Sequence, residues 1–160
     1  MRVVRPLVLA TALLLLSASH AHADATLFLG STTTPSARMA RGFAIGGGFL
    51  VFGFEFEYSD TKESAEDAAP SLRTGMGSIL FQTPGAIAGF QPYFTTGGGG
   101  YRERLNDRSE TDVAGNVGGG VKVHLVGPLR ARFDYRVFRL RGEPLHDVVH
   151  RFYAGINLNF

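Results

Sequence analysis

Charged side chains recur at alternate positions within two segments of this chain, at 55 and 57 in the segment 52–59 and from 130 to 136 in the segment 129–137. Residues two apart in a β-strand point to the same face, so each segment would have a charged face and an apolar face as a strand. Carboxylates and guanidinium groups that face each other can neutralise one another as ion pairs, or they can select ions in a narrow pore. The charged positions are Glu55, Glu57, Arg130, Arg132, Asp134 and Arg136.

Serine, histidine and acidic residues offer a second chemistry. Ser59 and Ser109 are candidate nucleophiles, and a serine, a histidine and a carboxylate joined by hydrogen bonds can hydrolyse an ester. His146 and His150, with the carboxylate of Asp147, could also bind a metal ion, but the spacing of these residues matches no recognised metal site. We therefore predict a solvated loop here, with no catalysis, no metal and no cofactor. The residues concerned are Glu143, His146, Asp147 and His150.

The elements that must position these side chains are strands. Apolar and polar residues alternate in eight segments, and no helical repeat fits them, so an all-β fold is predicted. The glycine runs 97–100 and 118–120 are not followed by a predicted helix, which excludes phosphate-binding loops and favours close packing of strands. The predicted strands are 25–33, 41–49, 51–59, 72–81, 90–102, 112–125, 129–139 and 148–160.

The connections between these strands alternate in length. Short ones are expected near Leu50, at 82–89 and at 126–128, with the glycines 46–48 as an alternative to Leu50 for the first bend. Long loops at one end and short turns at the other are typical of an up-and-down transmembrane barrel. The long polar connections are 34–40, 60–71, 103–111 and 140–147.

The N-terminal residues predict a signal peptide over 1–23, which would leave a single barrel domain over 24–160. Arg2 and Arg5 precede an apolar run, and a small-residue cleavage site ends at Ala23, with cleavage after Ala25 as the alternative. Removing the two arginines lowers Lys+Arg from 16 to 14, which equals the 14 Asp+Glu. A neutral chain gives no reason to expect a nucleic-acid partner. There is no cysteine, so disulfides are excluded.

The last strand alternates up to a terminal Phe160, over about the ten residues that a tilted strand needs to cross a bilayer. Aromatic residues recur on the apolar faces of the strands, and ionic residues share the other faces with glycines. These features favour a membrane barrel over the alternatives of a soluble lipocalin-like barrel or a sandwich. The chain resembles the small eight-stranded outer-membrane β-barrel family, the OmpA/OmpX-like group. The resembling stretches are 97–101, 118–123, 130–136 and the terminal strand.

The resemblance implies an antiparallel barrel in the bacterial outer membrane, reached through the periplasm. It also implies that the barrel-assembly machinery recognises the last strand. Some barrels of this kind are lipid A enzymes, but the chain lacks a His-x-Ser pairing like that of the lipid A deacylases. The predicted assembly signal is Phe152, Tyr153, Ile156, Leu158 and Phe160.

With the apolar faces toward lipid, the predicted lumen charge network also includes Arg73, Lys122 and Arg151. Eight strands leave an interior that side chains can fill, and the third and seventh strands would face each other across it. We therefore predict a plugged lumen rather than a small porin-like transport pore. The predicted role is structural or surface interaction, such as envelope integrity or adhesion. Outer-membrane lipid and lipopolysaccharide are the expected partners, and a surface ligand is left open. The mixed-charge loops 60–67 and 102–112 fit contact with lipopolysaccharide or with a host or envelope partner, but the sequence favours ordinary solvated loops.

Overall fold

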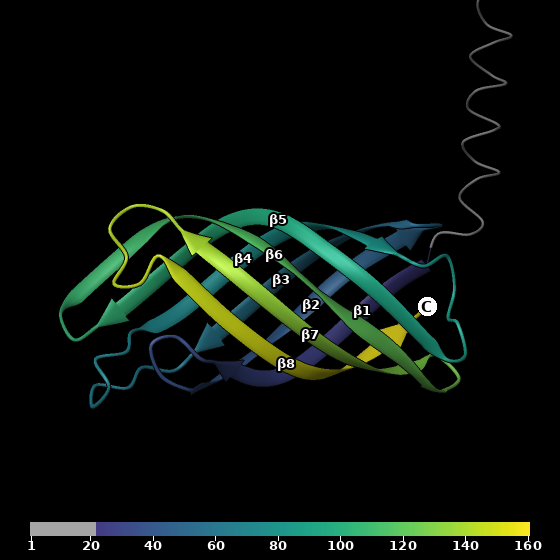
Figure 1. The fold of residues 1–160 in the computed structure, drawn as a ribbon, viewed down its shortest axis with the longest axis horizontal. Helices are drawn as coiled ribbons and strands as arrows, with labels where there is room; N and C mark the ends of the chain where they lie inside the picture. Colours follow the sequence, from purple (N-terminus) through teal and green to yellow (C-terminus); the bar gives the residue numbers. More distant parts are fainter. Residues whose placement is uncertain (1–21) are drawn as a thin grey trace, which may run out of the picture.

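The computed structural model describes residues 22–160, which form eight strands (Figure 1). Every strand is hydrogen-bonded and antiparallel to its neighbours in sequence, and β8 pairs with β1, so the sheet closes into a barrel. The predicted all-β, eight-stranded antiparallel up-and-down barrel is confirmed. The strands are β1 His22–Thr32, β2 Arg38–Phe49, β3 Phe52–Thr61, β4 Ser71–Gln82, β5 Phe90–Leu105, β6 Arg108–Val126, β7 Leu129–Leu140 and β8 Val148–Asn159.

No helix within residues 22–160 is long and apolar enough to cross a membrane. The predicted signal peptide lies outside the described residues except for its last two positions, His22 and Ala23, where β1 begins.

The two ends of the barrel differ in the connections they carry. The turn end holds the C-terminus and the connections 50–51, 83–89 and 127–128, whereas the loop end holds the connections 33–37, 62–70, 106–107 and 141–147 (Figure 1). The connection 62–70 is the longest of these, and 83–89 is as long as 141–147. The predicted short turn at Leu50 is confirmed, and residue 50 takes the left-handed conformation that closes it (φ 55°). The alternative bend at 46–48 is wrong, because these glycines lie within β2.

One predicted long connection, 103–111, is also wrong. In its place β5 and β6 continue as paired strands, joined only by Asn106 and Asp107, with Asn106 in the left-handed conformation (φ 51°). Both faces of this hairpin are polar, because it extends beyond the loop end of its neighbours (Figure 1). The alternation of apolar and polar residues therefore ends several residues before β5 ends, and it begins several residues after β6 begins.

The barrel buries polar side chains and exposes apolar ones, which is the reverse of a soluble domain. Along β3, Phe52, Phe54 and Phe56 are exposed, whereas Glu55 and Glu57 are buried in the lumen. The same division holds along most of β7 and β8, where Arg132, Arg136 and Arg151 are buried and Phe133 and Phe152 are exposed. Near the loop end of β7 it reverses, because Phe138 is buried and Arg139 is exposed. The predicted inside and outside faces of these strands agree with the structure.

Candidate functional site

Six charged side chains meet at the centre of the lumen and form what we call the central ion network. Arg136 Nη2 donates to Glu55 at 2.7 Å and Arg136 Nε to Asp134 at 3.0 Å, while Arg132 Nη2 donates to Asp134 at 3.1 Å. Arg132 also donates to Glu55 through Nη1. With three carboxylates and three guanidinium groups, the network is formally neutral. Its members are Glu55, Glu57, Arg132, Asp134, Arg136 and Arg151.

Strand alternation and barrel closure produce this arrangement together. Every second residue of β3 and of β7 points inward, and long side chains from these strands reach each other across the lumen. Arg151 of β8 joins them by donating to Glu57 and to Ser59. Glu57 Oε2 also lies 3.2 Å from Arg136 Nη1, an ion pair without hydrogen-bond geometry. Pairing of this kind makes buried charge tolerable.

Two tyrosines hold the network in place. Tyr93 donates to Asp134 and accepts from Arg132 Nε at 2.7 Å, and the Arg132 guanidinium lies 4.8 Å from the centre of the Tyr93 ring. Tyr153 donates to Asp134 at 3.0 Å and stacks on Phe28 with its ring centroid 4.1 Å away. The sequence prediction had missed Tyr93, although it lies on the inward face of β5, and had assigned Tyr153 only to the assembly signal.

An apolar cluster lies in the lumen on the loop side of the network; we call it the apolar seal. The Phe138 ring is its link to the network, because the Arg151 guanidinium lies 4.5 Å from its centre. Phe138 and Leu140 continue the inward face of β7 beyond Arg136, so their positions could have been inferred from strand alternation. The members are Leu72, Met76, Tyr101, Ala114, Phe138, Leu140 and Val149.

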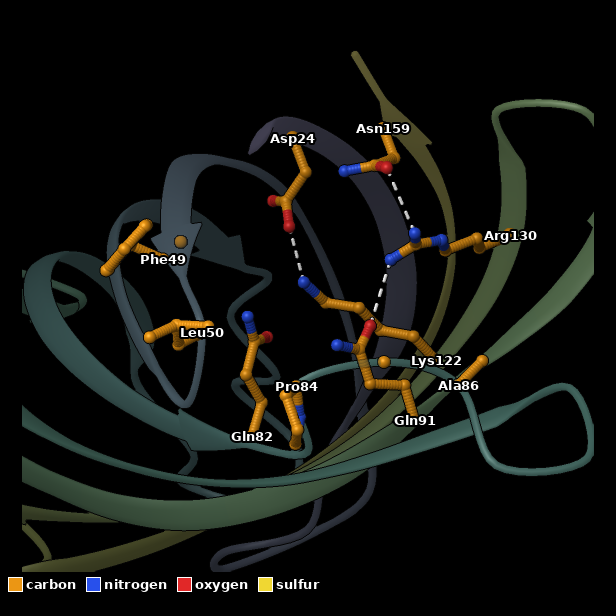
Figure 2. A pocket seen from close by; sticks show the side chains of 12 residues that line it. Asp24, Phe49, Leu50, Gln82, Pro84, Ala86, Gln91, Lys122, Arg130 and Asn159 are labelled. Atoms are coloured by element: carbon orange, nitrogen blue, oxygen red, sulfur yellow. Dashed lines mark hydrogen bonds and ion pairs between the residues drawn. The ribbon is translucent and has the colours of Figure 1, made fainter. Parts of the chain in front are cut away.

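A cavity of about 400 Å³ lies on the other side of the network, at the turn end (Figure 2). Lys122, whose side chain is 2% exposed, points toward Asp24 and donates to it. Arg130 donates to the amide oxygens of Gln91 at 2.9 Å and Asn159 at 3.0 Å. Lys122 and Arg130 thus lie in the lumen as predicted from their strands, but their partners are separate from the central ion network. Asp24 was not predicted as a partner.

The prediction that Arg73 lies in the lumen was wrong. Its side chain is 63% exposed on the outer face of β4, and its Nε donates to Asp60 at 3.0 Å. The neighbouring positions Leu72 and Thr74 point inward instead. The prediction assumed that polar residues face inward throughout, but near the loop end the outer face of the barrel is polar as well.

The serine and histidine candidates do not meet. Ser59 pairs with Thr74 at 2.7 Å inside the lumen, and Ser109 accepts from Arg102 at 3.4 Å. His150 Nδ1 instead pairs with the Tyr135 hydroxyl at 2.7 Å. Within residues 22–160 no hydrogen bond joins a serine hydroxyl to a histidine ring, and no three potential metal ligands converge. The described part of the chain therefore holds no serine activated by a hydrogen bond to histidine.

The predicted assembly residues of β8 divide between the two faces. Phe152, Ile156 and Leu158 lie on the exposed outer face, and Phe160 is 75% exposed beside the turn end, whereas Tyr153 points into the lumen. The backbones of Phe160 and Ala23 exchange two hydrogen bonds of 2.8 Å, a pairing that the predicted cleavage after Ala23 would remove.

No protein-family model and no curated protein sequence matches the chain. Solved structures do match it. Neisserial surface protein A superposes with a TM-score of 0.67 at 17% identity, covering 88% of this chain and 96% of that one. The N-terminal barrel of Pseudomonas aeruginosa OprF gives 0.63 at 17% identity, with 87% and 97% covered. The outer-membrane enzyme PagL gives 0.54 at 12% identity, with 84% and 98% covered.

The chain therefore has the fold of the small eight-stranded outer-membrane β-barrels, as predicted. Because this fold occurs both in a surface protein and in an enzyme, it does not define an activity. Function must be argued from the lumen and the surface of this chain.

Proposed function

We propose that this chain is an integral protein of the bacterial outer membrane, with a closed lumen and a structural or surface-interaction role, and without catalysis. The observation that carries the proposal is the reversed distribution of side chains, with a neutral ion network inside and large apolar residues outside. Exposing this apolar outer face to water would cost much free energy, whereas contact with lipid hydrocarbon would avoid that cost.

The closed lumen follows from two barriers in series. The central ion network fills the middle of the barrel with side chains that are almost completely buried, and the apolar seal closes the loop side above it. A permeating ion would have to separate salt bridges and then cross an apolar layer. The cavity at the turn end therefore ends blindly at the network. This arrangement argues against the alternative of a small transport pore.

The surface role is supported by the loop end. The loop 62–70 and the β5–β6 hairpin carry charges of both signs and extend beyond the barrel wall. Such segments suit contact with lipopolysaccharide or with a protein partner outside the membrane. One structural neighbour, neisserial surface protein A, is named for that location. The neighbour PagL is an enzyme, but here no serine hydroxyl of the described residues contacts a histidine ring.

Three measurements on the full chain test the proposal. Expressed in a Gram-negative host, the protein should fractionate with the outer membrane and migrate differently in unheated and boiled electrophoresis samples. A soluble periplasmic band of constant mobility would exclude the membrane barrel. In planar bilayers the folded protein should give no steady channel, and a stable ion-selective conductance would favour the pore instead.

A further inference from the structure

Three arginines gather on the outer wall of the barrel near the loop end. Arg73 of β4 is paired in register with Arg102 of β5. Two residues nearer the loop end on each strand, Ser71 is paired with Arg104. These four residues line a hollow of about 60 Å³. We call Arg73, Arg102 and Arg104 the arginine patch.

The patch has too little negative charge of its own. Like charges on directly paired strand positions repel each other, so Arg73 beside Arg102 is unfavourable without an anion. Within the described residues, Arg102 and Arg104 form no salt bridge, and Asp60, which pairs with Arg73, also lies 3.7 Å from Arg41.

The carboxylate nearest in sequence cannot supply the missing charge. Glu103 stands between Arg102 and Arg104, but strand alternation turns it to the opposite face. There it is buried and accepts a hydrogen bond from the Leu145 backbone at 2.8 Å. The outer wall is left with hydroxyl groups beside the arginines: Ser71 in the hollow and Ser109, which contacts Arg102 at 3.4 Å.

The patch lies at the edge of the apolar belt. On β4, Phe81 is exposed eight residues after Arg73, toward the turn end, which at about 3.3 Å per residue and about 40° tilt corresponds to about 20 Å of barrel height. The apolar band of outer-membrane barrels is about 25 Å tall. The backbone of Arg73 would therefore stand just inside the edge of the band, from which its long side chain can reach the lipid headgroups.

An apolar groove of about 760 Å³ leads away from the patch. Arg73 and Arg41 stand at its polar end, and Phe43, Leu27 and Ile156 line its walls. Gly42 and Gly155 also border the groove, and Asp60 stands with the two arginines at its polar end. The groove could accept an acyl chain from a molecule whose headgroup is held by the arginines.

We propose that the arginine patch binds a phosphate group of a phosphorylated glycolipid in the outer leaflet, whose acyl chain lies in this groove. Guanidinium groups bind phosphate through paired charge-assisted hydrogen bonds, and the serine hydroxyls can donate to the remaining oxygens. The inference rests on the proposed membrane location, with the loop end facing the outer leaflet.

The test uses the full-length mature protein folded in zwitterionic detergent micelles and titrated with bisphosphorylated lipid A by native mass spectrometry. The parent should bind it, and dephosphorylated lipid A should bind at least tenfold more weakly. The triple variant Arg73→Gln, Arg102→Gln, Arg104→Gln should lose about 100-fold in affinity, about fivefold for each arginine. A control double variant at exposed arginines outside the patch, the loop 62–70 and the β5–β6 hairpin, Arg139→Gln with Arg141→Gln, should stay within about threefold of the parent. The charge-matched double variant of the patch, Arg102→Gln with Arg104→Gln, should lose about 25-fold.

Two readouts keep the conclusions separate. Electrophoresis of unheated samples reports folding, so a parent protein that does not form a barrel contradicts the proposed function. A folded parent that binds bisphosphorylated and dephosphorylated lipid A with equal affinity contradicts only the proposed role of the arginine patch. Equal losses in the patch variant and the control variant would also overturn it, as would inorganic phosphate binding as tightly as the lipid. Should the triple variant not fold, Arg104→Gln alone must lower the affinity about fivefold.

Discussion

Glu55→Gln tests whether the central ion network stabilises the barrel as a set of buried pairs. Glu55 Oε1 accepts hydrogen bonds from Arg132 Nη2 at 3.1 Å and from Arg136 Nη2 at 2.7 Å. The substitution keeps the side-chain volume but removes one negative charge. The network then holds three guanidinium groups and two carboxylates, in a space that excludes water from the arginine side chains.

The expected cost is large because the charges are left behind. Removing one partner of a buried ion pair destabilises a protein by about 3–5 kcal/mol. With a urea m-value of about 2 kcal/mol per molar, the unfolding midpoint in lipid vesicles should fall by about 1.5–2.5 M. Tyrosine fluorescence and loss of the unheated electrophoretic mobility provide two independent measures of this midpoint.

The neighbouring residue provides the control. Phe54 is 68% exposed on the outer face, so Phe54→Leu should change the free energy of unfolding by less than about 1.5 kcal/mol. Combining Glu55→Gln with Arg132→Gln restores neutrality, and the double variant should recover about 2–3 kcal/mol relative to the sum of the single changes. A loss below about 1 kcal/mol for Glu55→Gln, with no coupling to Arg132, would mean that water solvates the lumen and would refute the buried network.

Three further predictions concern assembly, packing and processing. Phe160→Ala should lower the amount of inserted protein seen in outer-membrane fractions more than its stability, because its burial in lipid contributes at most about 1.5–3 kcal/mol; unchanged levels would contradict this. Gly120→Ala should destabilise the folded barrel by about 1–3 kcal/mol in urea, since its methyl group would lie 2.5 Å from the Tyr93 hydroxyl, and an unaffected midpoint would refute the packing argument. The intact mass of the mature protein should correspond to a chain beginning at Asp24, as the small-residue cleavage site predicts, and such a chain keeps the partner of the buried Lys122 ammonium; the mass of a chain that begins at Thr26 would contradict this.

Sequence reasoning succeeded where one rule decides the outcome. Alternation of period two assigned Glu55 and Glu57 to one face of β3 and the phenylalanines to the other, and the structure agrees. The position of β3 opposite β7 follows from having eight strands in sequence order around a closed barrel. Both inferences need only the pleat of the strands and their number.

Alternation did not reveal which inward residues touch. Asp24 and Lys122 are 98 residues apart in the chain, and their contact depends on the height of each strand in the barrel. That height is set by the stagger between neighbouring strands, which alternation leaves open. For the same reason the network was expected to include Arg130, whose actual partners are the amides of Gln91 and Asn159.

The two clearest errors, Arg73 and the β5–β6 connection, have a common cause. In both cases a polar residue was taken as a sign of the lumen or of a loop. A strand that extends beyond the apolar belt instead has polar residues on both faces, while it stays hydrogen-bonded to its neighbour. The height at which this change occurs marks the edge of the belt on each strand. If the barrel lies in the membrane as proposed, the outward arginines of β4 and β5 mark the headgroup level. If its lumen is closed as proposed, this outer rim and the loops above it remain as the surface through which the barrel can act.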